Sequence, residues 1–275
     1  MGESQLEQVG SDELFYVPAS AFAALAASEL SREDRAAVFV AYVRINVLYS
    51  IARAWSGHPG TCLSSVDLMS WLFLHRMDGL GQGDEACDLF FSSKGHDAPA
   101  LYAVLTGLGL LDFDLMHRLR RLDGLAGHPH VETPFIQANT GSLGMGISKA
   151  KGMAIANRLS GTRHRIYVLT GDGELQEGQI WESLGSAVEG KLDEITVIVD
   201  HNKIQSDTWV DEVAPLGDLE AKFAAFGWRV ERCDGHDFAA IDEALGRLDA
   251  VPGVPKVLVA DTVKGKGISF MEGPA

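Results

Sequence analysis

The chain has 275 residues, of which 46% are hydrophobic and 22% are charged, a composition typical of a soluble globular protein. Its net charge of −15 gives no general electrostatic attraction to phosphate, so nucleic acid is not expected as a main partner. There is no run of ~18 unbroken apolar residues and no secretory start, and the three cysteines are scattered, so we expect a cytoplasmic protein with free thiols and no membrane contact.

Helical patterns dominate the first part of the chain. Residues 18–54 are predicted to be helical, with Ser31 as an N-cap before an acidic turn, and the pattern stops at residues 56–60, Ser-Gly-His-Pro-Gly. Three elements are expected next: a helix over 65–77, a strand over 88–91 and a helix over 99–108.

Strands and helices alternate more plainly in the second part. Apolar runs predict strands over 165–170, 195–200, 228–232 and 256–260, and helices are predicted over 179–189, 216–226 and 238–248. Alternation at this spacing predicts an α/β fold with a mostly parallel sheet and helices on both faces. No linker divides the chain, so we expect a single domain over 1–275, with 1–30 as an N-terminal extension.

Two polar residues follow consecutive strands of the predicted sheet. Asp172 stands between two glycines after the strand 165–170, and Asn202 follows the strand 195–200. Ligands bind past the carboxyl ends of such strands, and neighbouring strands lie about 4.8 Å apart, so both side chains can point into one crevice. Carboxylate, amide and main-chain oxygens suit Mg²⁺ or Ca²⁺. The pair therefore predicts a metal that holds a diphosphate against an acidic protein.

The same pair carries a family resemblance. Gly-Asp-Gly, 28 intervening residues and Asn202 resemble the thiamine-diphosphate motif. Five further segments resemble motifs of transketolase, in that family's order, so that the similarity covers about residues 35–270. These segments are 56–60, 93–96 (Ser-Lys-Gly-His), 127–129 (Gly-His-Pro), 139–146 (Asn-Thr-Gly-Ser-Leu-Gly-Met-Gly) and 264–267 (Lys-Gly-Lys-Gly). The chain thus resembles the thiamine-diphosphate-binding, N-terminal half of a split transketolase.

The resemblance implies a role for each matching residue. Asp172, Asn202 and the main-chain oxygen of Ile204 would hold Mg²⁺ (or Ca²⁺), and His58 and His128 would be the catalytic residues that contact the sugar. Glu177 would join a carboxylate network at a subunit interface. The residues implied to bind thiamine diphosphate are Thr61, His96, Gly141, Ser142, Leu143, Gly173, Asn202 and Lys264.

The implied reaction moves a two-carbon ketol unit from a ketose (phosphate) to an aldose (phosphate). The cofactor ring serves as the electron sink, and histidines shuttle protons to and from hydroxyl groups. In this family the activating glutamate comes from a second domain on the partner subunit. We therefore expect an α2β2 assembly with a C-terminal partner subunit. A histidine that usually follows the family's basic turn has no counterpart in 267–275, which leaves the sugar open.

Several alternatives remain at this stage. The chain could serve a specialised, non-phosphorylated or modified sugar, it could belong to a decarboxylating enzyme of the same cofactor class, or it could be a non-catalytic subunit that retains the cofactor fold. The three histidine motifs argue against the second, and intact Asp172, Asn202 and His96 argue against the third. Singly, the segments have simpler interpretations: Asp200 could be a surface residue, and Lys264 could belong to a solvated turn.

Overall fold

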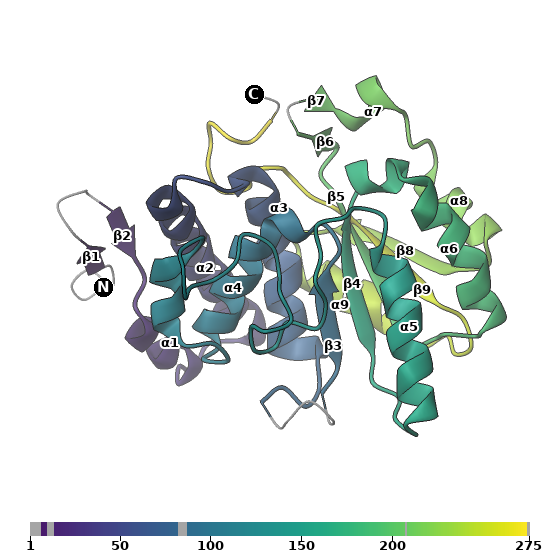
Figure 1. Ribbon diagram of the computed structural model, residues 1–275, viewed down its shortest axis with the longest axis horizontal. Helices are drawn as coiled ribbons and strands as arrows, with labels where there is room; N and C mark the ends of the chain where they lie inside the picture. The colour runs from purple at the N-terminus through teal and green to yellow at the C-terminus, as the bar shows by residue number, and fades with distance from the viewer. Residues whose placement is uncertain (1–6, 10–13, 82–86, 207, 274–275) are drawn as a thin grey trace.

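A central parallel sheet organises the molecule (Figure 1). The computed structural model describes residues 7–9, 14–81, 87–206 and 208–273. Five strands, all parallel, form the sheet in the order β3-β4-β5-β9-β8, which confirms the predicted α/β class. These strands are β3 (Leu89–Ser92), β4 (Ile166–Gly171), β5 (Ile195–His201), β9 (Lys256–Asp261) and β8 (Arg229–Asp234). The expected N-terminal extension, 1–30, falls partly outside the described residues.

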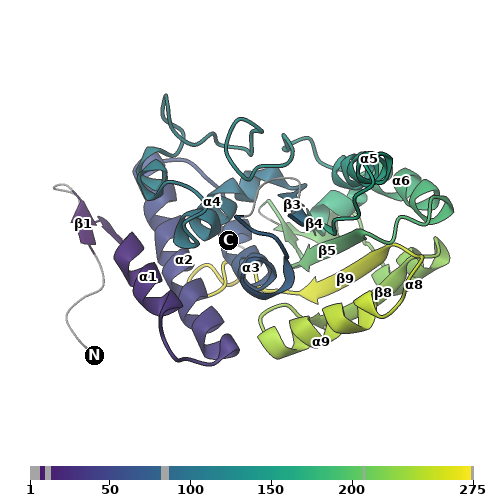
Figure 2. The ribbon, with the colours of Figure 1, turned by 90° about the horizontal axis from the view of Figure 1, so that it is seen from below.

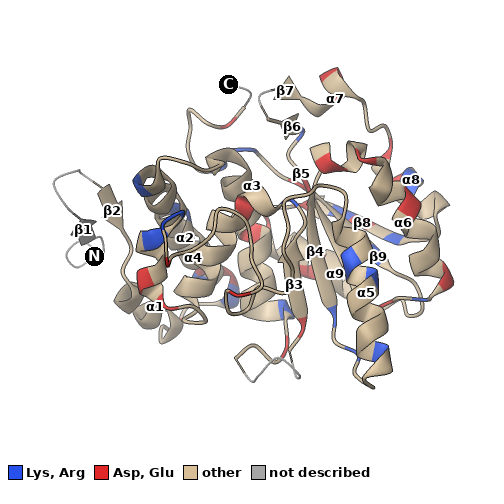
Figure 3. Cartoon of the chain, in the orientation of Figure 1, with Lys and Arg blue, Asp and Glu red and all other residues tan. Residues whose placement is uncertain are grey.

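Helices cover both faces of this sheet (Figures 1 and 2). One face packs on α2 (Arg32–Ala54), α3 (Pro59–Trp71), α4 (Ala98–Gly107) and α9 (Phe238–Asp249), with α1 (Ala19–Ala26) outside them. The other packs on α5 (Gly146–Leu159), α6 (Gly178–Glu189) and α8 (Leu219–Ala225). Because both faces are buried, the strands are almost continuously apolar, and Figure 3 shows charges mainly on helices and loops.

Short elements complete the described chain. Two small antiparallel pairs join β1 (Glu7–Val9) to β2 (Leu14–Tyr16) and β6 (Ile204–Gln205) to β7 (Thr208–Trp209). The remaining short helices are η1 (Leu72–Arg76), η3 (Gly95–Asp97), η4 (Phe113–Arg118), η5 (Gly173–Gln176) and α7 (Val210–Val213). Two of them, η3 and η5, directly follow β3 and β4, so they carry the polar residues at the carboxyl edge of the sheet.

The N-cap expected at Ser31 is confirmed, because its side chain accepts a hydrogen bond from the Asp34 main-chain nitrogen at 3.0 Å. The helical stretch expected over 18–54 is therefore divided into α1 and α2. The helix expected over 65–77 begins earlier, at Pro59, since proline suits the first position of a helix. It also ends in the π-helical turn η1. Thr61 therefore lies in the first turn of α3 rather than in a loop.

The helix α2 is long and apolar enough to cross a bilayer, since it has 23 residues and contains an 18-residue stretch with a mean hydropathy of 1.3. It nevertheless packs along α3 and α4, and its inner residues belong to the core cluster of that face. Its N-terminal turn and its middle carry charges, including Arg44, which pairs with Asp67 of α3. The apolar character of α2 is therefore explained by its packing in the core of the domain.

Candidate functional site

The three expected metal ligands line one cavity at the carboxyl ends of β4 and β5. The Asp172 side chain is almost fully buried, and its carboxylate accepts hydrogen bonds from the main-chain nitrogens of Gly173, at 2.7 Å, and Lys203. The Asn202 side-chain oxygen accepts one from the Ile204 nitrogen at 3.1 Å. The loop 202–204 thus wraps around Asp172, and it gathers a carboxylate, an amide and main-chain oxygens.

This donor set fits a hard divalent cation such as Mg²⁺, which prefers oxygen ligands and keeps positions for phosphate oxygens. Within the described residues no three His, Cys, Asp or Glu side chains form a cluster of the kind that binds zinc. Burial, and then the charge of Asp200, raise the pKa of Asp172 to about 6. A cation bound beside Asp172 would favour its charged form.

Lys264 and Gly173 line the cavity beside these ligands, and Gly60 packs against the Lys264 side chain. The Lys264 ammonium donates to the main-chain oxygens of Ser206 at 2.6 Å and Ile204 at 3.4 Å. A Cβ on Gly60 would lie 3.0 Å from the Lys264 side chain, and one on Gly173 would lie 2.8 Å from the Gln205 Cβ. The lysine therefore does not belong to a freely solvated turn, and Gly173 packs closely against the Gln205 side chain.

The side chains of the first two histidine motifs, His58 and His96, meet beside this cavity, whereas His128 of the third motif lines neither of the two described cavities. The rings of His58 and His96 have centroids 5.1 Å apart and lie nearly perpendicular, and both line a second cavity that also includes Thr61, Lys264 and Phe270. Burial and neighbouring cations lower the pKa of His58 below its usual value. Burial, with Lys94 nearby, lowers the pKa of His96 to about 3. Both rings are therefore neutral near pH 7.

The glycine loop holds the third histidine in place. Gly141 has a φ of +133°, and a Cβ there would lie 2.8 Å from the His128 ring. His128 in turn accepts a hydrogen bond on its main-chain oxygen from the Tyr102 hydroxyl at 3.2 Å. Leu143 lines both cavities, whereas Gly141 and Ser142 lie outside the described linings.

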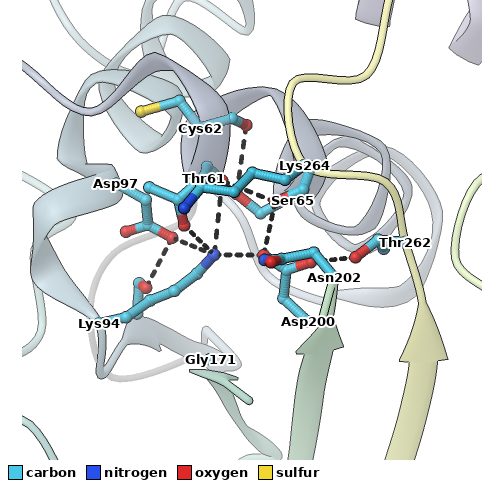
Figure 4. Close-up of polar contacts among 12 residues, drawn as sticks. Thr61, Cys62, Ser65, Lys94, Asp97, Gly171, Asp200, Asn202, Thr262 and Lys264 are labelled. Atoms are coloured by element: carbon cyan, nitrogen blue, oxygen red, sulfur yellow. Dashed lines mark hydrogen bonds and ion pairs between the residues drawn. The ribbon is translucent and has the colours of Figure 1, made fainter. Parts of the chain in front are cut away.

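Sequence reasoning missed a buried ion pair, shown in Figure 4, of which Lys94 lines the cavity and Asp200 lies behind it. Lys94 is 1% exposed, and its ammonium lies 2.5 Å from the Asp200 carboxylate and 2.8 Å from the Thr61 hydroxyl. Asp200 is fully buried, so its interpretation as a surface residue was wrong. The one available signal was the position of Lys94 and Asp200 at the ends of two apolar strands, where ligands bind in such sheets.

A buried carboxylate, Glu174, was missed as well. It accepts hydrogen bonds from the Ser93 hydroxyl and from the main-chain nitrogens of Gly144 at 2.8 Å and Gly171 at 3.3 Å. It therefore joins the glycine loop to the ends of β3 and β4. The neighbouring Glu177 is exposed at the start of α6, and a Cβ on Gly144 would lie 2.8 Å from the Glu177 Cβ.

Comparison with known proteins agrees with this geometry. Residues 35–274 match the family profile described as the thiamine diphosphate binding domain of transketolase. The chain is 38% identical, over 84% of its length and 86% of the relative, to the 6-deoxy-6-sulfo-D-fructose transketolase subunit SqwG of Clostridium sp. (strain MSTE9). It is also 38% identical to one of the subunits of the apulose-4-phosphate transketolase of Actinobacillus succinogenes, over 79% of its length and 80% of the relative.

Solved structures give the same answer for the fold. The transketolase from Leishmania mexicana superimposes with a TM-score of 0.79 and 29% identity over 87% of this chain. The superposition covers 38% of that longer chain, whereas the two bacterial subunits are matched over most of their length. The chain therefore belongs to the transketolase family, a family of transferases, and corresponds to the N-terminal, thiamine-diphosphate-binding subunit of its two-chain members.

Proposed function

We propose that this chain, together with a C-terminal partner subunit, Mg²⁺ and thiamine diphosphate, transfers a two-carbon ketol unit from a ketose or ketose phosphate to an aldose or aldose phosphate. One observation carries the proposal: the oxygens of Asp172, Asn202 and Ile204 line a cavity whose other wall holds His96, with His58 beside it. The relatives act on different sugars by their names, which supports the ketol transfer without fixing the sugar pair.

In this proposal Asp172, Asn202 and the main-chain oxygen of Ile204 hold Mg²⁺, with Ca²⁺ as the alternative hard ion. The diphosphate lies against Gly173, which lines the cavity, and within reach of His96 and Lys264. Thr61 and Leu143 form the adjoining wall, and Gly141 and Ser142 shape the loop that carries Leu143. The positive charge of the metal and of Lys264 offsets the acidic balance of the chain.

Bound thiamine diphosphate supplies the nucleophile and the electron sink for cleavage of the carbon–carbon bond. The chain's own contribution is proton transfer and orientation. His58 is neutral near pH 7, so it can accept a proton from a sugar hydroxyl and return it later. His128 approaches the same space from the glycine loop. His96 stays neutral because its pKa is about 3, so it acts as a hydrogen-bond partner and not as a cation.

The partner subunit is proposed to supply the glutamate that activates the cofactor, in an α2β2 assembly. The names of the relatives, which call them subunits, support a partner. Glu177 is exposed beside the glycine loop, and we propose that it contacts the partner there. The free thiols of Cys62, Cys87 and Cys233 support a cytoplasmic location.

Reconstitution tests the proposal. The purified chain is mixed with the partner subunit obtained by co-purification, and thiamine diphosphate is titrated calorimetrically with and without Mg²⁺. Binding heat that depends on Mg²⁺, followed by ketol transfer in a screen of donor and acceptor sugars, is the expected result. Absence of binding heat in the reconstituted pair would refute the cofactor assignment, and ketol transfer by the single chain alone would refute the two-chain assignment.

A further inference from the structure

We propose that Lys94 and Asp200 are positioning residues for the metal site: their buried ion pair fixes the side-chain amide of Asn202 so that its oxygen, and not its nitrogen, faces the metal. This inference rests on the proposed function, since it assumes that Asn202 is a metal ligand. None of the resemblances used above assigns a role to either residue, and Asp200 does not itself line the cavity.

The Lys94 ammonium connects three elements around the cavity, namely the end of β3, the end of β5 and the first turn of α3 (Figure 4). The residue follows β3, its Nζ lies 2.5 Å from the Asp200 carboxylate at the end of β5, and it donates to the Thr61 hydroxyl of α3 at 2.8 Å. The Asp97 carboxylate lies 3.6 Å away and adds a second negative charge. A lysine with so little exposure requires such partners, because an unpaired buried ammonium is costly.

Asp200 is held by donors on several sides. Besides Lys94, it accepts hydrogen bonds from the Ser64 hydroxyl at 2.6 Å and from the Thr262 hydroxyl. Its remaining contact is with Asn202, whose side-chain nitrogen donates to it at 3.2 Å. Its oxygens are engaged by these groups, so Asp200 is not available as a metal ligand. It presents a fixed acceptor to Asn202 instead.

The orientation of the Asn202 amide follows from this acceptor. An asparagine amide has one acceptor oxygen and one donor nitrogen, and only the oxygen can bind a cation. Because the nitrogen faces Asp200, the oxygen faces the Ile204 nitrogen and the cavity, where a second lone pair is available. A rotated amide would place its nitrogen toward the metal. The ion pair therefore selects the orientation that can bind.

The double variant Lys94→Met/Asp200→Asn tests the inference, since it removes both charges together and keeps side chains of similar size. We expect the Mg²⁺ concentration that half-saturates thiamine diphosphate binding, measured calorimetrically in the reconstituted pair, to rise about 10- to 100-fold. The turnover number at saturating Mg²⁺ should change much less than this half-saturation concentration. A merely structural role predicts the opposite: a lower melting temperature with an unshifted half-saturation.

A matched control lies at the other edge of the sheet, where Arg158 pairs with the buried Glu194 at 2.7 Å. Arg158→Met/Glu194→Gln should lower the melting temperature and leave the Mg²⁺ half-saturation within about twofold of the unsubstituted value. If the first double variant fails to fold, Ser64→Ala decides, because it removes one donor to Asp200 and should raise the half-saturation about threefold.

The outcomes separate this inference from the proposed function. If the unsubstituted pair shows no Mg²⁺-dependent binding of thiamine diphosphate, the proposed function fails and this inference fails with it. If the unsubstituted pair binds normally, while a folded Lys94→Met/Asp200→Asn variant, or Ser64→Ala, shows an unshifted half-saturation, only the positioning role is overturned.

Discussion

An ion pair with a buried carboxylate lies at each end of the strands of the sheet, the amino ends (the amino edge) and the carboxyl ends (the carboxyl edge), but the two pairs have different surroundings. At the amino edge, Arg158 donates to the Glu194 carboxylate and to the main-chain oxygens of Gly190 and Lys191 at 2.6–2.8 Å. All of its partners belong to the helix end and loop that it joins. At the carboxyl edge, the Lys94–Asp200 pair is surrounded by hydroxyls, an amide and a glycine-lined cavity.

The difference lies in what the ion pair faces. Burying a charged pair contributes little net stability, because desolvation offsets the attraction. At the amino edge the pair closes a surface loop, and the pocket beside Arg158 is lined by Arg163, Lys191, Asp193 and Gly253 and holds no proposed metal ligand. At the carboxyl edge it stands directly behind the side chains that could bind a metal. Substitutions at the carboxyl edge should therefore change ligand binding, whereas those at the amino edge should change only stability.

The largest expected effect comes from removing the carboxylate of the metal site. Asp172→Ala should weaken Mg²⁺-dependent binding of thiamine diphosphate at least about 100-fold, since it deletes the only charged member of the proposed ligand set. Calorimetry of the reconstituted pair measures the affinity, and circular dichroism checks that the fold is kept. An unchanged affinity in a folded variant would rule out the ligand role.

The next largest effect is expected at Gly141 of the glycine loop. Gly161, which follows α5, serves as the comparison because both glycines have a positive φ. Gly141→Ala should lower the free energy of unfolding by about 2 kcal/mol, because the new Cβ is strained and also meets the His128 ring. Gly161→Ala, with a φ of +77° and no atom within 4 Å, should cost about 1 kcal/mol and leave ketol transfer intact. Urea unfolding measures both; equal losses would show that the contact with His128 is unimportant.

Most of the sheet could be predicted from the sequence, but only part of the candidate site at the carboxyl ends of its strands. Asp172 and Asn202 were found because each directly follows an apolar strand, and parallel strands end at the same edge. Lys94 and Asp200 were not, since they are 106 residues apart in the chain and only the strand order β3-β4-β5 brings them together. A lysine or an aspartate alone is usually exposed, so the position of each at the end of an apolar strand was not enough to predict a buried pair. The start of α2 was predicted correctly from Ser31 and its acidic turn, whereas the end of α1 at Ala26 was missed because no glycine or proline follows it.

Stability against acid should report on His96. Its pKa is lowered to about 3 in the folded chain, from about 6.5 when unfolded, so between these values the unfolded chain binds a proton that the folded chain does not. Above about pH 6.5 this group therefore does not lower the free energy of unfolding, and below it the free energy of unfolding falls as the pH drops. From pH 7.5 to 5 the loss is about 1–2 kcal/mol, and it should be absent in His96→Asn.

The measurement is urea unfolding of the metal-free chain at both pH values. Asp97 and Asp172, whose pKa values are raised to about 6, contribute with the opposite sign, but they are present in both proteins and cancel in the comparison. A pH dependence in His96→Asn equal to that of the unsubstituted chain, or steeper, would show that His96 is not held neutral.

The smallest effect is expected at the amino edge. Arg158→Met leaves the Glu194 carboxylate with its second partner, Arg163 at 3.1 Å, so the free energy of unfolding should fall by only about 1 kcal/mol. Binding of thiamine diphosphate should not change. A shift in Mg²⁺ dependence from this substitution would remove the distinction between the two edges.

The most direct test of the shared metal site is a Mg²⁺ titration of thiamine diphosphate binding in the reconstituted pair, comparing the unsubstituted chain with Asn202→Leu, which replaces the amide by an apolar group of similar size. We predict saturable Mg²⁺ dependence in the first and at least about 100-fold weaker dependence in the second, with the fold unchanged. The same Mg²⁺ dependence in both proteins would contradict the claim that Asp172 and Asn202 bind one cation.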